Sequence, residues 1–429
     1  MQLSAVSHHH SSPSRAMAIA RWQTRAGATV IAMLVAGTWQ AVAADLGRPL
    51  PAPTGKLAIG RVTYFWTDSS RPEMNTPDER DKRELRVELW YPAEASPSAR
   101  VAPYFPDLPA LNKQLGAETM LLGSIKGHAL ADPPVATGNG RYPLLLLSPG
   151  MGTNGIQYTA IVEELVSHGY VVATVDHPFQ SRAIVYPDRR VVVIAQPSPQ
   201  EVARLRADPE NSRQDYREKV ELRSADLRFV LDQLQRLDAG QGASEDDKKF
   251  KDRFDLQRVG VIGHSIGGVA APEACSDDPR FKASVNMDGH ASSLPFFPSE
   301  DGNGPRQPFL ELTDGPPIPT DQDLAKAKMT REEFNQKAAS VAKFVDDLMR
   351  TIVGGGFRVT IPGVRHQSFS DAAIWDPGTL EERYRRIQIM RDYVRAFFDK
   401  TLLGKQQTLL DAESSPYSEV TVERFGPPK

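Results

Sequence analysis

The feature of this sequence that most restricts its fold is a serine placed between an apolar strand and a helix of small residues. The run Val259–Gly263 leads into the turn Gly263–Gly267, which reads GHSIG, and a small-residue helix is expected from Gly267 to Cys275. A serine on so sharp a turn is strained, and glycines two positions to each side let the neighbouring strands and the helix approach. The pattern predicts that Ser265 is a nucleophile, with a plain strand-to-helix turn as the alternative.

From Tyr142 onward, continuous apolar runs alternate with amphipathic stretches, which is typical of a parallel sheet covered by helices on both faces. The expected strands are Leu144–Leu147, Tyr170–Val175, Arg258–Ile262, Ala283–Met287, Phe309–Leu312 and Phe357–Ile361. The expected helices are Gln157–Ser167, Gln214–Leu237, Gly267–Cys275, Asp321–Ile352 and Leu380–Leu403. The alternation predicts one α/β domain with a mostly parallel, doubly wound sheet.

The remaining segments are assigned around this core, 141–403. Residues 44–140 are expected to supply antiparallel edge strands, Ala58–Trp66 and Leu85–Tyr91, and then a long ordered loop with a helical turn, 93–140. A hairpin Ala183–Val193, turning at Pro187 and Asp188, and the segment Pro199–Asp215 are expected to be surface insertions. Residues 404–429 are expected to form a C-terminal tail.

The first 43 residues have the pattern of an export signal. Three arginines (Arg15, Arg21 and Arg25) precede the uncharged apolar run Ala26–Thr38, and the small-residue site Ala41–Ala43 follows it. The run is shorter than the roughly 20 residues that a bilayer-spanning helix needs. The sequence therefore predicts a signal peptide at 1–43, cleavage near Ala43 or Ala44 and a secreted or periplasmic protein, with an uncleaved anchor as the alternative.

Charge and cysteine content exclude several classes of function. Without the three arginines of 1–43, the chain keeps 48 basic residues against 54 acidic ones, a net charge of −6. This acidic balance, without basic runs interleaved with aromatic residues, argues against a nucleic-acid partner. Cys275 is the sole cysteine, so no intramolecular disulfide forms, and its apolar helix predicts a core position. No residues have metal-ligand spacing, and we expect neither a metal nor a cofactor.

A serine nucleophile needs a base within hydrogen-bond reach, and His366 is the best candidate. A serine hydroxyl is a weak nucleophile at neutral pH until a neighbouring histidine accepts its proton. Only His290 and His366 follow Ser265 in the sequence. His366 comes after the last predicted strand, in a loop at the carboxyl end of the sheet, where parallel sheets place their sites. His290 is expected to be structural or to face the substrate.

The acid that orients the base has three candidates. Asp288 follows the strand ending at Met287, and Asp314 follows the strand ending at Leu312. Asp371 is too near His366 in sequence to come from a separate strand end, and we expect it to cap a helix. Both Asp288 and Asp314 follow the end of a predicted parallel strand, and the periodicity of the sequence does not distinguish between them.

Three blocks of the sequence resemble the platelet-activating factor acetylhydrolase family, plasma and intracellular type II, including its bacterial esterase relatives. They are YPLLLLSPGMGTNGIQYTAIVEELVSHGYVVATVD (Tyr142–Asp176), GHSIGGVAAPEACSDDPRFKASVNMDGH (Gly263–His290) and GVRHQSFSD (Gly363–Asp371), within a similarity that extends to about Asp399. The resemblance implies the α/β-hydrolase fold. It also implies that Asp288, 23 residues after Ser265, is the acid of a Ser265, Asp288, His366 triad, with Asp314 in reserve.

Acyl transfer also requires N–H donors for the oxyanion that forms on attack. One is expected to be the backbone N–H of Ile266, at the start of the helix after the nucleophile. The loop after the Leu144 strand should supply the second, and by position in the resembling family this is the N–H of Met151. The family usually has histidine where this chain has Pro149. Proline lacks an N–H, so the sequence does not determine the shape of this loop or the acyl preference. The N–H of Met151 remains available as a donor.

The resulting expectation is a serine carboxylic-ester hydrolase that forms an acyl-enzyme. The resemblance implies short-acyl esters, such as platelet-activating-factor-like or oxidised phospholipids, as substrates. Transient contact with a lipid surface is a further expectation, based on the aromatic run Leu294–Pro298. A broad carboxylesterase or polyester-type hydrolase is the first alternative, and a binding protein on a hydrolase scaffold is the second, because a fold does not specify function. His290, Phe296 and Phe297 are candidate substrate-pocket residues, with a buried aromatic pair as the alternative for the phenylalanines. The Asp321–Ile352 helix is interpreted as packed, with a lid as the alternative.

Overall fold

The computed structural model describes residues 49–426, apart from 96–97, 117, 139, 290–305, 316–318 and 413–414. The predicted signal peptide at 1–43 therefore lies outside the described residues. So do His290, Phe296 and Phe297, the three candidate pocket residues. The described residues form two compact units, a larger one that contains a central sheet and a smaller helical one.

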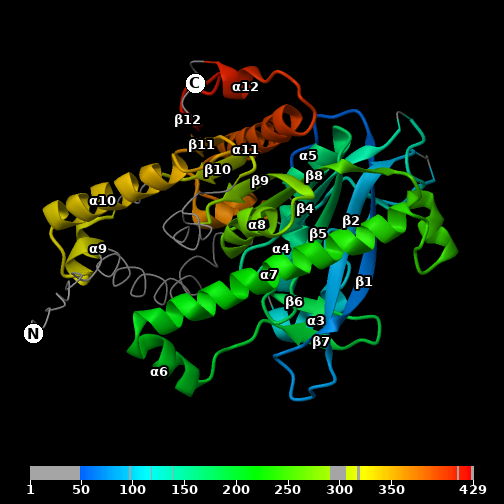
Figure 1. The fold of residues 1–429 in the computed structure, drawn as a ribbon, viewed down its shortest axis with the longest axis horizontal. Coiled ribbons are helices and arrows are strands. Elements are labelled where there is room, and N and C mark those ends of the chain that lie inside the picture. Colours follow the sequence, from blue (N-terminus) through cyan, green and yellow to red (C-terminus); the bar gives the residue numbers. More distant parts are fainter. Residues whose placement is uncertain are drawn as a thin grey trace, which may run out of the picture. The chain divides into compact units, whose positions relative to one another are not determined.

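A ten-stranded sheet runs through the larger unit, which comprises the described residues of 45–196, 218–318 and 342–429. Side by side, its strands are β12 (Thr421–Phe425), β11 (Gly356–Thr360), β10 (Phe309–Thr313), β9 (Phe281–Met287), β8 (Phe254–His264), β4 (Tyr142–Ser148), β5 (Val171–Asp176), β2 (Lys82–Ala93), β1 (Ala58–Pro72) and β3 (Leu130–Ala131) (Figure 1). Neighbours from β11 to β5 are parallel. Strand β2 is antiparallel to β5 and to β1, and β12 is antiparallel to β11. The predicted mostly parallel sheet is confirmed.

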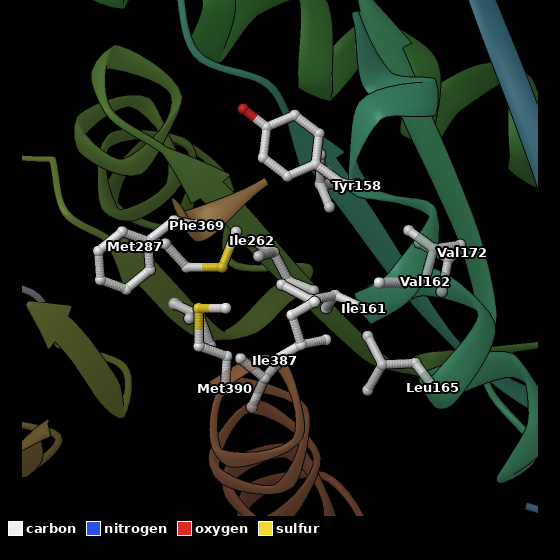
Figure 2. Close-up of a cluster of buried hydrophobic side chains, with 14 of the residues drawn as sticks. Tyr158, Ile161, Val162, Leu165, Val172, Ile262, Met287, Phe369, Ile387 and Met390 are labelled. Carbon is white, nitrogen blue, oxygen red and sulfur yellow. The ribbon is translucent and has the colours of Figure 1, made fainter. Parts of the chain in front are cut away.

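Helices cover both faces of the sheet, which explains why its central strands are apolar without alternation. Leu144 and Leu146 of β4 pack in one core with helices α7 and α8, whereas Leu145 and Leu147 pack in another with α5 and α11. Figure 2 shows the second core, where Ile161 of α5 and Ile387 of α11 lie close to Ile262 of β8. These helices are α5 (Thr159–Ser167), α7 (Pro209–Asp238), α8 (Ile266–Asp277) and α11 (Leu380–Thr401).

All six predicted parallel strands are present, and the predicted hairpin is too. Strands β6 (Ala183–Val185) and β7 (Val191–Val193) pair antiparallel around the expected turn. The stretch 93–140, expected to hold one helical turn, holds two short helices, α3 (Leu108–Leu115) and α4 (Glu118–Ser124). Proline in the first turn of α3 is compatible with a helix start, because the first turn needs no N–H partner within the helix. Short 3-10 helices are η1 (Gly155–Tyr158), η2 (Glu245–Phe250), η4 (His366–Phe369) and η5 (Asp371–Trp375).

The described part of 404–429, where the sequence predicts a C-terminal tail, contributes an edge strand to the sheet. Helix α12 (Thr408–Asp411) is followed by β12, which pairs with β11 from Thr421 opposite Thr360 to Phe425 opposite Gly356. Glu423 also lies 3.5 Å from Arg358 of β11. The strand is short, charged and at the edge of the sheet, so its apolar pattern is too weak to be recognised in the sequence.

The smaller unit comprises the described residues of 197–217 and 319–341, whereas the sequence predicts a single α/β domain. It contains α6 (Pro199–Ala207), the first turns of α7, α9 (Asp321–Lys326) and the start of α10 (Arg331–Met349). The predicted continuous helix over 321–352 is wrong, because Lys328 has a φ of 51° and Thr330 caps a new helix. The Thr330 and Glu333 side chains exchange capping hydrogen bonds with each other's backbone N–H. Among the described helices, none combines the length and apolar character required to cross a bilayer.

Candidate active site

Ser265 occupies the tight turn between β8 and α8. Its φ of 55° lies in the left-handed region, which non-glycine residues rarely adopt without a structural reason. The Ser265 N–H donates to the carbonyl of Met287 on β9, which holds the turn against the neighbouring strand at 2.9 Å. A Cβ added at Gly263 would lie 1.8 Å from the carbonyl oxygen of Gly267. The flanking glycine is thus required by close backbone approach, as the sequence predicted.

His366 and Asp288 complete a hydrogen-bonded chain that begins at Ser265. The Nε2 of His366 lies 3.0 Å from the Ser265 Oγ, and its Nδ1 lies 2.5 Å from the Asp288 Oδ2. Asp288 follows β9 and is 6% exposed, whereas the His366 side chain is 35% exposed in η4. The Asp288 N–H donates to the carbonyl of Leu312 on β10, which fixes the carboxylate at the strand end.

This geometry defines the proton positions that acyl chemistry needs. A carboxylate only accepts hydrogen bonds, so the Nδ1 of His366 carries a proton toward Asp288 and the Nε2 of the neutral ring is an acceptor. The Ser265 hydroxyl can therefore donate to His366 Nε2, which prepares it for attack on a carbonyl carbon. The structure brings the three predicted side chains together, and their catalytic roles stay a prediction.

The loop that follows β4 approaches the nucleophile from the other side. A Cβ added at Gly150 would lie 3.4 Å from the Ser265 Cβ, so the backbone of this loop passes directly beside the serine. Met151, the next residue, is 37% exposed, and Ile266 is buried at the first position of α8. Both predicted oxyanion donors thus lie on segments adjoining Ser265. Their role as donors stays a prediction.

The two other candidate acids lie outside the hydrogen-bonded chain. Asp314 is exposed at the end of β10, and partial desolvation together with the Asp288 charge raises its pKa to about 6. Asp371 is buried and accepts the N–H groups of Thr159 and Ala160, at 2.9 Å each. It therefore caps the N-terminus of α5, a helix distant in sequence, rather than its own η5. Burial raises the pKa of Asp371 to about 7.

A second histidine, not predicted from the sequence, lies beside His366. His264, between Gly263 and Ser265, is 1% exposed and places its Nε2 2.8 Å from the backbone carbonyl oxygen of His366. Its Nδ1 lies 2.7 Å from the hydroxyl of Tyr158, which also accepts the N–H of Gly150 at 2.9 Å. His264 is part of the serine motif, but its partners depend on long-range contacts that the motif does not encode.

A further serine, histidine and aspartate form a buried chain next to the same loop. The His177 Nε2 lies 2.9 Å from the Ser148 Oγ, and its Nδ1 lies 2.8 Å from the Asp226 Oδ2. Arg223 donates to the carbonyl of Pro149 at 2.5 Å. Ser148 and His177 are fully buried, so this hydrogen-bonded series does not face solvent, and it fixes the loop through Ser148. In the sequence, His177 is recognisable only as a polar residue after a predicted strand, because its partners Ser148 and Asp226 lie 29 and 49 residues away.

The sole cysteine, Cys275, lies in the core, as the sequence predicts. Cys275 is free and buried in α8, and burial raises the pKa of its thiol to about 12. A thiol in this state is protonated at neutral pH and is not a nucleophile. Within the described part of the chain, no group of three or more histidine, cysteine, aspartate or glutamate side chains is arranged to hold a metal ion.

Comparison with known proteins places these observations in context. Residues 74–384 match the family described as platelet-activating factor acetylhydrolase, isoform II. A platelet-activating factor acetylhydrolase of Cavia porcellus is 29% identical over 226 residues, which are 47% of this chain and 49% of that protein, so this match spans about half of the relative's length.

Two other matches cover nearly the whole of the similar protein. A probable 1-alkyl-2-acetylglycerophosphocholine esterase of Arthroderma benhamiae is 25% identical over 91% of this chain and 98% of that protein. Among solved structures, a ferulic acid esterase from Streptomyces cinnamoneus superposes with a TM-score of 0.65 at 31% identity, covering 88% of this chain and 99% of the other. The similarity therefore extends well beyond the serine motif.

Proposed function

The chain belongs to the platelet-activating factor acetylhydrolase family, isoform II, and from this premise we propose that it is a serine carboxylic-ester hydrolase acting through an acyl-enzyme. The observation that carries the proposal is the hydrogen-bonded series from Ser265 through His366 to Asp288, with contacts of 3.0 and 2.5 Å. Such a chain at the carboxyl ends of parallel strands, beside a loop that offers backbone N–H groups, has the parts that acyl transfer requires.

The reaction proceeds in two steps. His366 Nε2 takes the proton of the Ser265 hydroxyl while Oγ attacks the ester carbonyl carbon, and Asp288 stabilises the imidazolium that forms. The N–H groups of Met151 and Ile266 bind the oxyanion of the tetrahedral intermediate. His366 then gives the proton to the departing alcohol. A water molecule, deprotonated by His366, attacks the acyl-enzyme and releases the acid with the serine restored.

The substrates we propose are short-acyl esters, including platelet-activating-factor-like and oxidised phospholipids. The names of the relatives support this class, because the animal protein is a platelet-activating factor acetylhydrolase and the fungal protein a probable 1-alkyl-2-acetylglycerophosphocholine esterase. A broad carboxylesterase is the second candidate, since the superposed structure is that of a ferulic acid esterase. Esters of increasing acyl length, each with and without a phosphocholine head group, together with a feruloyl ester, would distinguish the two.

Export is part of the same proposal. The arginines, apolar run and small-residue site of 1–43 support a secreted or periplasmic location. Mass spectrometry of the mature protein would test it, with a new N-terminus expected near Ala43 or Ala44.

Replacement of the nucleophile tests the proposed chemistry directly. Ser265→Ala removes the attacking oxygen, and we expect hydrolysis of p-nitrophenyl acetate to fall by at least about 1,000-fold. A fluorophosphonate probe should label the unmodified protein on Ser265 and leave the variant unlabelled. Both are measured on the full chain, by absorbance and by mass spectrometry of the labelled peptide.

The matched control is Ser276→Ala, near the end of the same helix. Ser276 is exposed and its hydroxyl donates to the carbonyl of Pro272, so its removal should leave turnover unchanged. Retained hydrolysis in Ser265→Ala, or labelling at another serine, would contradict the proposed function. Absence of labelling in the unmodified protein would favour a binding protein on a hydrolase scaffold.

A further inference from the structure

Tyr158 and His264 connect the two loops that meet at Ser265. His264 Nε2 lies 2.8 Å from the carbonyl oxygen of His366, the residue that serves as base. His264 Nδ1 lies 2.7 Å from the Tyr158 hydroxyl, and that hydroxyl accepts the N–H of Gly150 at 2.9 Å. Gly150 immediately precedes Met151 in the loop Ser148–Gly152, which we call the oxyanion loop because it carries the proposed donor N–H of Met151. One uninterrupted series of hydrogen bonds therefore runs from the base to the oxyanion loop.

The chemistry of the end groups fixes the direction of these hydrogen bonds. The carbonyl of His366 can only accept, so His264 Nε2 must carry the proton. In the neutral imidazole the Nδ1 is then an acceptor, and the Tyr158 O–H donates to it. This leaves the lone pairs of the Tyr158 oxygen for the N–H of Gly150. Burial raises the pKa of Tyr158 to about 12, which keeps the hydroxyl protonated at neutral pH.

Packing alone does not account for the hydroxyl of Tyr158. Its ring belongs to the same apolar core as Ile161 of α5 and Ile262 of β8, and Figure 2 shows its oxygen directed away from the neighbouring aliphatic side chains. The residue is fully buried, and phenylalanine would fill the same space. A buried hydroxyl is costly unless it is hydrogen-bonded, and here its partners are the residue beside the nucleophile and the oxyanion loop.

We propose that Tyr158 and His264 are a positioning pair that holds His366 and the oxyanion loop in register around Ser265. The inference rests on the proposed function, because it assigns the pair to the same reaction. Proton transfer to His366 and oxyanion binding must occur together in the transition state, and small displacements of either group lower the rate. The pair touches no reacting atom, so its loss should act on kcat and leave KM nearly constant.

Tyr158→Phe tests the pair with little change of shape. We expect kcat for p-nitrophenyl acetate to fall about 10- to 100-fold, with KM within about twofold of the unmodified protein. Tyr170→Phe is the matched control, since Tyr170 is also fully buried and donates its hydroxyl to Asp399 at 2.8 Å, a group with no part in the site. The control should lose similar stability in urea unfolding and retain kcat.

His264→Gln provides the second variant, because its amide can still donate to the carbonyl of His366. We expect it to retain more kcat than His264→Ala, and we expect the effects of Tyr158→Phe and His264→Ala to be less than multiplicative when combined, since both break one series of bonds. An unchanged kcat in Tyr158→Phe, a change confined to KM, or multiplicative effects would overturn the positioning pair while leaving the triad in place. Absence of turnover in the unmodified protein would overturn both proposals.

Discussion

Two carboxyl groups stand near His366, and only one of them contacts its ring. The Oδ2 of Asp288 lies 2.5 Å from the Nδ1 of His366, while Asp314 is exposed at the end of the neighbouring strand, where burial and the Asp288 charge raise its pKa. A hydrogen-bonded carboxylate fixes the tautomer and stabilises the imidazolium, which a more distant charge does not do. The two aspartates are therefore expected to contribute unequally to catalysis.

Replacing each aspartate by asparagine separates their roles. Asp288→Asn should lower kcat by about 1,000- to 10,000-fold, because an amide favours the wrong tautomer of His366. Asp314→Asn should change kcat by no more than a few-fold. Both are measured with p-nitrophenyl acetate at constant pH, with urea unfolding as the check on folding. A larger loss in Asp314→Asn would transfer the acid's role to that residue.

Residues whose roles follow from chain order could be predicted from the sequence. Ser265 and His366 come from the motif and from the position after the last parallel strand, and the structure places them 3.0 Å apart. The choice of Asp288 required the family resemblance, since two strand ends were equivalent by pattern. The roles of Tyr158 and His264 could not be predicted from the sequence. Tyr158 lies 106 residues from His264, and His264 lies 102 residues from His366, so these side chains meet only in the folded protein.

At the scale of elements, the turn between β8 and α8 depends on a contact that leaves no room for a side chain. A Cβ added at Gly267 would lie 2.2 Å from the carbonyl oxygen of Ser148 and 2.7 Å from that of Pro149. These carbonyls belong to the backbone of the oxyanion loop, which cannot yield as a flexible side chain would. Helix α8 and the loop after β4 are therefore packed backbone to backbone.

Gly267→Ala is expected to destabilise the protein by roughly 1 to 3 kcal/mol, as overpacking of a close contact does. Turnover should fall as well, because the loop that carries Met151 must move. The control is Gly123→Ala in α4, where the added Cβ would lie 3.5 Å from Leu108 Cδ1, an ordinary contact. That variant should gain up to about 1 kcal/mol from helix propensity. Equal unfolding free energies in urea for the two variants would contradict this account.

Element types were easier to predict than element ends. The continuous apolar runs identified every parallel strand, because burial on both faces leaves a strong signal in the sequence. The break between α9 and α10 was missed, although Thr330 and Glu333 form the S/T-x-x-E pattern of a capping box. Strand β12 was missed because its sequence carries no clear pattern: a short edge strand with charged residues resembles a loop.

At the scale of the whole molecule, the stability of the folded protein depends on ionisable side chains that are buried in the larger unit. His177 and Asp226 are both fully buried, and Asp226 also pairs with Arg83 at 2.7 Å. Burial, followed by the positive charge of Arg223, lowers the pKa of His177 to about 4. The salt bridges of Asp226 hold its own pKa well below its ordinary value. The folded state thus requires His177 to be neutral.

This requirement predicts a dependence of stability on pH. The folded pKa of His177 lies below its ordinary value of 6.5, so between about pH 6.5 and 4 the unfolded chain binds a proton that the folded protein does not. The free energy of unfolding should therefore fall as pH falls through this window, by up to about 3 kcal/mol from this group. The lowered pKa of Asp226 adds a further loss only below about pH 4, where the carboxylate of the unfolded chain becomes protonated.

Urea unfolding of the unmodified protein and of His177→Gln, at pH 7 and pH 5, measures this contribution. Buried carboxyl groups with raised pKa, such as Asp371, oppose the trend over the same range, so the difference between the two proteins is the informative quantity. We expect the unmodified protein to lose more stability on acidification than the variant. Parallel curves for the two would show that His177 does not titrate with unfolding.

The loop after β4 also bears on how this protein could be redesigned. Its backbone is fixed at Ser148 by His177, at Pro149 by Arg223 and at Gly150 by Tyr158. The side chain of Met151 takes no part in these bonds and is partly open to solvent. A library of substitutions at position 151 would therefore change a side chain on the loop beside Ser265 while the predicted donor N–H keeps its place, which makes this residue the natural first target for directed evolution of acyl-chain preference.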